Sequence, residues 1–191
     1  MKHTRIALFI SGKGSNARNI MEYFQNHGNI CVSLVLSSTV NPGMEDACQS
    51  KQIAFESYSS LVFEDCLRIC QTNQIDWIIL AGFLKKIPAA FIEAYPGRII
   101  NIHPALLPNF GGKGMYGAHV HKAVAESNEH FSGITIHLVN AEFDKGKVLA
   151  QFAVALNNPT SPEYIEAEVR KLEMKYFPAV IESVICGSLI E

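Results

Sequence analysis

Charged side chains are scarce in this sequence, and long apolar runs are missing. Asp, Glu, Lys and Arg make up 18% of the 191 residues, below the roughly one quarter of an average soluble domain. No apolar run approaches the ~18 residues that would span a bilayer. The apolar run Ile6–Ile10 is too short for the hydrophobic region of a signal peptide and leads into Ser11-Gly12. We therefore expect a cytoplasmic protein with no membrane partner.

Clustered cysteines and blocks of basic residues are also missing. Among the five cysteines, Cys66 and Cys70 lie four positions apart in a segment with a helical pattern. Zinc sites use tighter Cys-x-x-Cys spacing, so we expect buried thiols rather than metal ligands. The net charge is −2, from 16 basic and 18 acidic residues, whereas a nucleic-acid surface needs a basic excess. The expected partner is a small molecule and not a nucleic acid.

The sequence does contain a regular alternation of short apolar runs with helical patterns. Such alternation is typical of βαβ units, with a parallel sheet covered by helices on both faces. With 48% hydrophobic residues, no linker and no repeats, we expect one α/β domain over residues 1–191 with a Rossmann-like, mostly parallel sheet. Strands are expected at 6–10, 31–36, 53–55, 77–81 and 99–103, helices at 15–25, 44–51 and 60–72, and a turn at 41–43.

The pattern changes after residue 130. Segments 131–139 and 146–156 are longer, strand-like and not separated by a helix, so we expect them to pair antiparallel. A last helix starts near residue 160 and runs towards Pro178, with apolar residues continuing to Ile185. Its N-cap is either Thr160, with Glu163 reaching back, or Ser161, with Pro162 at the first helical position.

The first candidate site is the glycine loop between the first strand and the first helix, Ser11–Asn16. Glycines allow a ligand to approach the backbone, and a helix N-terminus offers free N–H groups and partial positive charge to a phosphate. The loop also matches G-x-G-x-x-A through Ala17, which suggests a dinucleotide site. That site needs a carboxylate near the end of the second strand, where this chain has Ser37-Ser38-Thr39. A monophosphate fits better, and a plain tight turn is the alternative.

The second candidate site lies where the strand at 99–103 ends. Ligands of parallel sheets bind at the carboxyl ends of strands, and Asn101 and His103, two positions apart, project to the same face. An amide that donates to an oxyanion, beside an imidazole that donates a proton, suits acyl transfer. The alternative is that both side chains satisfy backbone groups of the following loop.

The third candidate site is the polar face of segment 133–139 and the loop after it. Thr135 and His137 alternate with apolar residues, and Asp144 follows in a loop ending Lys145-Gly146. A carboxylate close to His103 would orient the ring and raise its pKa, because an opposite charge favours the protonated form. Sequence alone does not place Asp144 there, and a solvated turn is the alternative.

Four motifs, in their order and spacing, resemble the folate-dependent formyltransferases. They are SGKGSN after the first strand, LAGFLKKI at 80–87, NIHPALLPNF at 101–110, and GITIHLV with FDKG at 133–146. The resemblance covers about residues 5 to 182. It is strongest to the branch that transfers the formyl group of 10-formyltetrahydrofolate to glycinamide ribonucleotide in purine biosynthesis, without a metal.

The resemblance implies a role for each matched residue. Asn101 would bind the formyl oxygen, His103 would be the general acid, and Asp144 would keep His103 charged. Thr135 and His137 would support the same pocket. The ribonucleotide and its phosphate would be bound by Gly14, Ser15, Asn16 and Glu173, and the folate by Leu84, Lys85, Lys86, Ile87 and Asn101.

Three alternatives stay open. A related formyltransferase would act on initiator methionyl-tRNA or a nucleotide sugar, a hydrolase would release formate from formyl-folate, and a dinucleotide-binding module would use only the glycine loop.

His119 and His121 could suggest a pair of metal ligands, but the sequence signals no third ligand. The loop at 110–118 is longer than in the commoner bacterial members, and the oligomeric state, monomer or homodimer, is not indicated.

Overall fold

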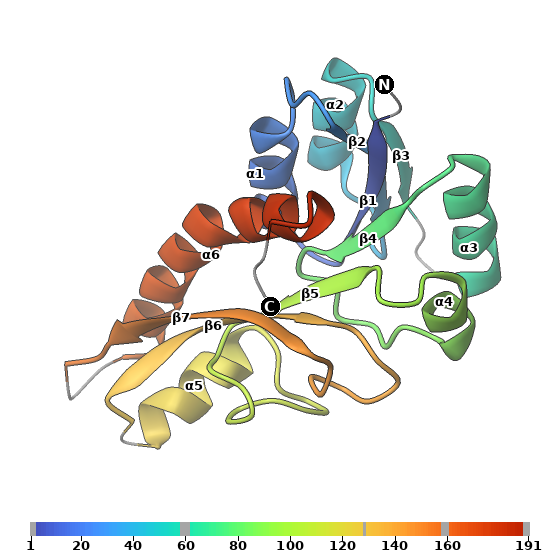
Figure 1. Cartoon of the computed structure of the whole chain (residues 1–191). Helices are drawn as coiled ribbons and strands as arrows, with labels where there is room; N and C mark the ends of the chain where they lie inside the picture. Colours follow the sequence, from blue (N-terminus) through green and yellow to red (C-terminus); the bar gives the residue numbers. More distant parts are fainter. Residues whose placement is uncertain (1–2, 58–61, 128, 158–160, 189–191) are drawn as a thin grey trace. The chain divides into compact units, whose positions relative to one another are not determined.

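The computed structural model describes residues 3–57, 62–127, 129–157 and 161–188, and the chain forms two compact parts, residues 1–100 and 101–191. Strand β5 runs across the division (Figure 1). The strands are β1 Thr4–Ile10, β2 Ile30–Ser37, β3 Ala54–Ser57, β4 Trp77–Leu80, β5 Ile99–His103, β6 Phe131–Leu138 and β7 Val148–Ala155. The helices are α1 Ser15–Tyr23, α2 Pro42–Ser50, α3 Phe63–Thr72, α4 Ala89–Ala94, α5 Ala118–Glu126 and α6 Pro162–Ile185.

The first part is built on a parallel sheet with the strand order β3-β2-β1-β4-β5. Strand β1 pairs in parallel with β2 and β4, and β2 pairs in parallel with β3. Ile6–Ile10 is completely buried, because helices cover both faces of these strands, with α1 on one side and α3 on the other (Figure 1). The predicted α/β class and parallel sheet are confirmed.

Two helix starts in the first part differ from the predictions. Helix α2 begins at Pro42 and not at Met44, because Asn41 caps it by accepting a hydrogen bond from the Met44 N–H (3.1 Å) and Pro42 occupies the first turn. Helix α3 begins at Phe63, and residues 60 and 61 of the predicted helix lie outside the described residues. Cys66 and Cys70 are buried free thiols, as predicted.

The second part contains the end of β5 and the strands β6 and β7, in that order. β6 and β7 pair antiparallel, as predicted, from Phe131–Ala155 to His137–Val148. Helix α6 packs on both strands and on α5. Ser161 is its N-cap, accepting from the Tyr164 N–H (3.2 Å), with Pro162 in the first turn. This supports the second of the two predicted caps, while Thr160 lies outside the described residues.

Two helices were not predicted, α4 and α5. Neither has a side chain that caps its N-terminus, and α5 begins after Gly117, which has a positive φ of 52°. None of the helices in the described part of the chain is long and apolar enough to cross a membrane.

Candidate active site

Strand β5 places the predicted amide and imidazole at its carboxyl end. Ile99, Ile100 and Ile102 are buried and hold the strand in the core, whereas Asn101 is half-buried. His103 is only 3% exposed. The Asn101 side-chain nitrogen Nδ2 lies 3.1 Å from His137 Nε2 on β6, so the strand end contacts the polar face of the next strand.

Asp144 lies between the two histidines. Its Oδ2 is 3.7 Å from His103 Nδ1, and its Oδ1 is 3.7 Å from His137 Nε2. The Gly112 N–H donates to Oδ2 at 2.9 Å. The structure therefore places Asp144 beside His103, a proximity that the sequence alone left open.

Backbone carbonyls determine where the two imidazole rings carry their protons. His137 Nδ1 lies 2.9 Å from the Leu138 carbonyl and donates to it. Its Nε2 faces the Asn101 amide (3.1 Å) and Asp144 Oδ1 (3.7 Å). His103 Nε2 lies 2.8 Å from the Phe110 carbonyl and donates to it, which turns Nδ1 towards Asp144.

Burial and the neighbouring carboxylate act in opposite directions on the pKa of His103. Burial lowers the pKa of His103 below its ordinary value of 6.5, because the imidazolium loses its hydration. The Asp144 carboxylate and the Phe110 carbonyl raise it, as expected, but by less than burial lowers it, and His137 lowers it further. Asp144 therefore acts on the pKa of His103 in the predicted direction, although burial outweighs it.

Asp144 stays ionised despite its position. Burial acts to raise its pKa, but the contacts with His137, the Gly112 N–H and His103 outweigh burial and hold the pKa below its usual range. The cluster thus combines a fixed negative charge with a buried imidazole that is readily deprotonated.

Two residues that contact His103, Phe110 and Asp144, have a backbone in the left-handed region. Phe110 and Asp144 both have a φ of 55°, in the left-handed region that side chains other than Asn and Asp rarely adopt. Phe110 is the outlier of the two, and such outliers cluster at functional sites, where the surrounding structure holds them in place. Here they hold the Phe110 carbonyl and the Asp144 carboxylate against one ring.

Thr135 holds the loop after β5 and is not available to a ligand. It is completely buried, and its hydroxyl donates to the Ala105 carbonyl (2.7 Å) and accepts from the Leu107 N–H (2.9 Å). Gln151 on β7 completes the network by donating to Thr135 Oγ1 (2.8 Å) and to the Leu107 carbonyl (2.9 Å). Gln151 is not among the predicted site residues, although it is the one polar residue in the apolar pattern of β7.

Gly146 allows the Asp144 loop to approach β6. A Cβ atom at this position would overlap the Leu138 carbonyl and lie 3.5 Å from His137 Nδ1. A glycine is therefore required here by close approach and not by backbone angle, and this explains the last residue of the FDKG motif.

The first part of the chain brings two of the predicted motifs together at Ser11. Its hydroxyl accepts from Ser38 Oγ (2.7 Å) and from the Leu84 N–H (3.0 Å). This joins the glycine loop to the LAGFLKKI motif. Gly14 has a φ of 73°, a conformation that favours glycine. Helix α1 follows it directly, with Ser15 half-buried and Asn16 buried.

The other predicted binding residues differ in exposure. Leu84, Lys85 and Lys86 are exposed and Ile87 is buried. In the second part of the chain, Glu173 on α6 is half-buried and contacts other residues. His121 is buried, whereas His119 is exposed and packs against Tyr116. In the described residues, no three His, Cys, Asp or Glu side chains are grouped to hold a metal ion.

Comparison with known proteins decides the family. The family model described as formyl transferase matches residues 4–181. The chain belongs to the formyl transferase family. It is 38% identical, over 96% of its length, to a chloroplastic phosphoribosylglycinamide formyltransferase of Arabidopsis thaliana, and spans 66% of that relative.

Solved structures of formyl transferases have the same fold. Glycinamide ribonucleotide transformylase 1 of Symbiobacterium toebii matches with a TM-score of 0.87 and 26% identity, over 99% of this chain and 91% of that one. Phosphoribosylglycinamide formyltransferase of Brucella melitensis matches with a TM-score of 0.83 and 30% identity, over 96% of each chain. Together with the seven strands described above, these matches confirm the predicted fold class.

Proposed function

We propose that this formyl transferase moves the formyl group of 10-formyltetrahydrofolate to the amine of glycinamide ribonucleotide, a step of purine biosynthesis. The observation that carries the proposal is the cluster of Asn101, His103 and Asp144 at the end of β5. The names of the plant relative and of the solved structures support this choice of substrate.

The proposed reaction needs no protein nucleophile and no metal. The amine of the ribonucleotide attacks the formyl carbon, and the carbonyl oxygen becomes an oxyanion. When the tetrahedral intermediate collapses, the bond to folate N10 breaks, and N10 takes up a proton while the amine loses one. The protein can act by positioning the two substrates and by stabilising charge.

The three residues of the cluster have different proposed roles. The Asn101 amide donates to the formyl oxygen, for which it exchanges its contact with His137. His103, once protonated, donates a hydrogen bond or proton to the oxyanion as general acid. Asp144 orients the ring and stabilises the imidazolium when it forms. His137 orients Asn101, and Thr135 holds the loop that follows His103.

The substrates are assigned to the remaining motif residues. The phosphate is bound by the backbone and side chains of Gly14, Ser15 and Asn16, where α1 begins without a side-chain cap. Glu173 contacts the glycinamide. The folate is bound by Leu84, Lys85, Lys86 and Ile87, largely through backbone groups, together with Asn101.

We further propose that the enzyme acts in the cytoplasm, as one domain over residues 1–191, without a metal and without nucleic acid. Its partners are the two small-molecule substrates. The alternatives that remain within the family are a formyltransferase with another acceptor and a hydrolase of formyl-folate.

Steady-state kinetics test the proposal. The absorbance change of folate deformylation is followed with and without glycinamide ribonucleotide. We expect turnover only when both substrates are present. Deformylation without the ribonucleotide would indicate a hydrolase, and no reaction in either case would refute the choice of substrates.

A pair of histidine variants tests the site. His103→Gln is expected to lower kcat/KM by about a hundredfold or more, because an oxyanion donor is lost. His119→Gln is the matched control, since His119 is exposed and outside the cluster. Equal activities of the two variants would remove His103 from its assigned role.

A further inference from the structure

Gln151 of β7 lies beside the buried Thr135 of β6. The two residues stand directly opposite each other in the antiparallel pair. The Leu156 N–H donates to the His130 carbonyl (2.8 Å), and hydrogen-bonded pairs alternate with non-hydrogen-bonded pairs from there. Gln151 and Thr135 therefore form a non-hydrogen-bonded pair, the kind in which the side chains lie closest.

The side-chain amide of Gln151 uses both of its N–H donors. Nε2 donates to the Leu107 carbonyl (2.9 Å) and to Thr135 Oγ1 (2.8 Å), and a glutamine amide has two N–H groups to give. Thr135 Oγ1 in turn accepts from the Leu107 N–H (2.9 Å). Both backbone groups of Leu107 are therefore tied to the β6–β7 pair, the carbonyl directly by Gln151 and the N–H through Thr135.

Leu107 connects this network to the backbone beside Asp144. Its side chain is buried, and it lies so close to Gly111 that a Cβ atom added there would be 2.5 Å from Leu107 Cδ2. The same Cβ atom would be 3.4 Å from the Asp144 Cβ. Gly111 therefore lies against both side chains, and its position depends on where Leu107 is held.

The two neighbours of Gly111 in the chain carry backbone contacts of the candidate site. The Phe110 carbonyl accepts from His103 Nε2 (2.8 Å), and the Gly112 N–H donates to Asp144 Oδ2 (2.9 Å). A displacement of this short segment would therefore change the contacts of the imidazole and of the carboxylate together.

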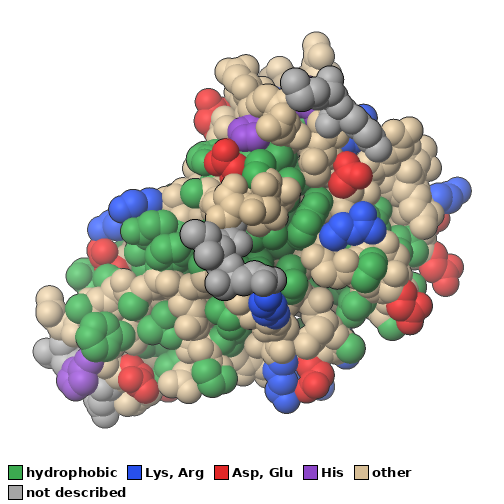
Figure 2. All heavy atoms as spheres, in the orientation of Figure 1, with side chains coloured by type: hydrophobic (Ala, Val, Ile, Leu, Met, Phe, Trp, Pro, Cys, Tyr) green, Lys and Arg blue, Asp and Glu red, His purple; other side chains and the backbone are tan. Residues whose placement is uncertain are grey.

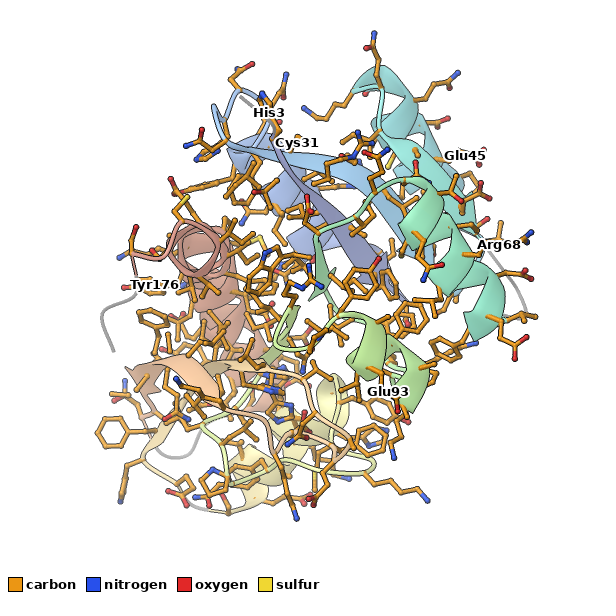
Figure 3. All side chains as sticks on the ribbon, turned by 45° about the vertical axis from the view of Figure 1, so that its right-hand side comes forward. His3, Cys31, Glu45, Arg68, Glu93 and Tyr176 are labelled. Atoms are coloured by element: carbon orange, nitrogen blue, oxygen red, sulfur yellow. The ribbon has the colours of Figure 1, made fainter. Side chains whose placement is uncertain are left out.

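Strand β7 is a firm support for Gln151. Neighbouring residues of a strand point to opposite faces, and the ring of Phe152 stacks on Tyr176 of α6, with centroids 3.8 Å apart and an angle of 5° between the planes (Tyr176 is labelled in Figure 3). Hydrophobic side chains gather on the face of Figure 2 where α6 and β7 lie in Figure 1. The strand is therefore packed from the side of α6, while Gln151 reaches to the other side.

Gln151 does not fill space in the core. It is exposed, whereas Thr135 is completely buried. Within the part of the chain that the structure describes, its side-chain hydrogen bonds go to Leu107 and Thr135 alone. An apolar side chain of the same length would leave no cavity at this position, so the hydrogen bonds can be removed while the fold is kept.

We propose that Gln151 is a positioning residue for the reaction: through Leu107 it holds residues 110–112 in place, and so keeps His103 and Asp144 in their catalytic arrangement. The proposal rests on the function proposed above, because it gives Gln151 a part in formyl transfer. An effect on the rate is expected because a misplacement of catalytic groups by ~1 Å can cost on the order of a hundredfold.

Steady-state kinetics of the full chain test the role in the reaction. Gln151→Met keeps the length of the side chain but has no N–H donor, and it is expected to lower kcat by about tenfold or more. Both KM values are expected to stay within about twofold, because Gln151 is assigned to neither substrate. Gln151→Lys keeps N–H donors and is expected to recover most of kcat. Gln71→Met, at an exposed position of α3, is the matched control and is expected to have the kcat of the wild type.

NMR titration of the His103 ring gives a second measurement that needs no substrate. The Phe110 carbonyl raises the pKa of His103. Gln151→Met loosens the segment that carries this carbonyl, so it is expected to lower that pKa below the wild-type value, whereas Gln71→Met is expected to leave it unchanged. A lowered pKa in a protein that transfers no formyl group would support the position held by Gln151 and count against the proposed function.

A third variant keeps the test decisive if Gln151→Met does not fold. Gln151→Glu keeps the shape of the side chain but cannot donate, and it is expected to show the same loss of kcat. The proposal would be overturned by a Gln151→Met protein with the wild-type pKa of His103, or with the kcat of an active wild type. Equal losses of kcat in Gln151→Met and Gln151→Lys would also overturn it, because the donors would then not matter.

Discussion

Two opposing effects act on the charge of His103. Its ring is 3% exposed and lies 3.7 Å from a carboxylate. Burial disfavours the imidazolium and Asp144 favours it, and burial has the larger effect. Burial therefore favours the neutral form of the ring before substrate binds.

Replacing Asp144 by asparagine tests this balance. Because the carboxylate raises the pKa of His103, Asp144→Asn is expected to lower that pKa further from a wild-type value that is already below 6.5. NMR titration of the His103 ring in both proteins measures the shift. An unchanged or raised pKa in the variant would contradict the assigned contact.

Thr135 is expected to matter for stability. Thr135→Val keeps the shape of the side chain but leaves the Leu107 N–H and the Ala105 carbonyl without their partner, at a cost of about 1–3 kcal/mol in the free energy of unfolding. Urea unfolding measures the change. The matched control is Thr72→Val at an exposed helix end, which is expected to have little effect, and equal losses in the two variants would refute the role of Thr135.

At the scale of single residues, the sequence predicted which side chains form the site better than it predicted their contacts with the backbone. Asn101 and His103 were recognised from their spacing at a strand end, and the structure places both in the predicted cluster. The carbonyl of Phe110 and the N–H of Gly112 carry no signature in the sequence, because every residue type has these groups. The pKa of His103 depends on burial, which a local sequence pattern does not quantify.

Among the structural elements, α6 is the clearest case of a sequence signal that the structure confirms. Ser161 accepts a hydrogen bond from the Tyr164 N–H, and Pro162 follows it. Ser161→Ala is expected to lower the free energy of unfolding by about 1 kcal/mol, because the first turn loses its cap. Ser161→Asp keeps an acceptor and is expected to retain stability in the same urea experiment. Equal stability of all three proteins would mean that the cap contributes nothing.

The elements that were not predicted lack such signals. Helix α4 has six residues, too few to show a helical period, and α5 starts after a glycine without a side-chain cap. The strands of the parallel sheet were predicted because complete burial requires continuous apolar runs. The antiparallel pair was predicted because no helix separates β6 from β7.

For the whole molecule, buried histidines predict how stability depends on pH. Burial lowers the pKa of both His103 and His121, so the unfolded chain binds protons at a higher pH than the folded one. The free energy of unfolding is therefore expected to fall as the pH drops through about 6.5, the pKa of histidine in an unfolded chain.

Urea unfolding at several pH values measures this dependence. His121→Gln removes one of the two groups and is expected to flatten the decrease. His119→Gln, at an exposed position, is expected to leave it unchanged. A wild-type stability that is constant or rises on acidification through this range would contradict the burial of neutral histidines.

The product of the reaction tests the central claim most directly. The protein is incubated with 10-formyltetrahydrofolate labelled with ¹³C in the formyl group and with glycinamide ribonucleotide, and the label is followed by NMR. The account predicts that the label appears as a formamide on the ribonucleotide and that His103→Gln suppresses this signal. Label found only as free formate, or only on the folate, would contradict it.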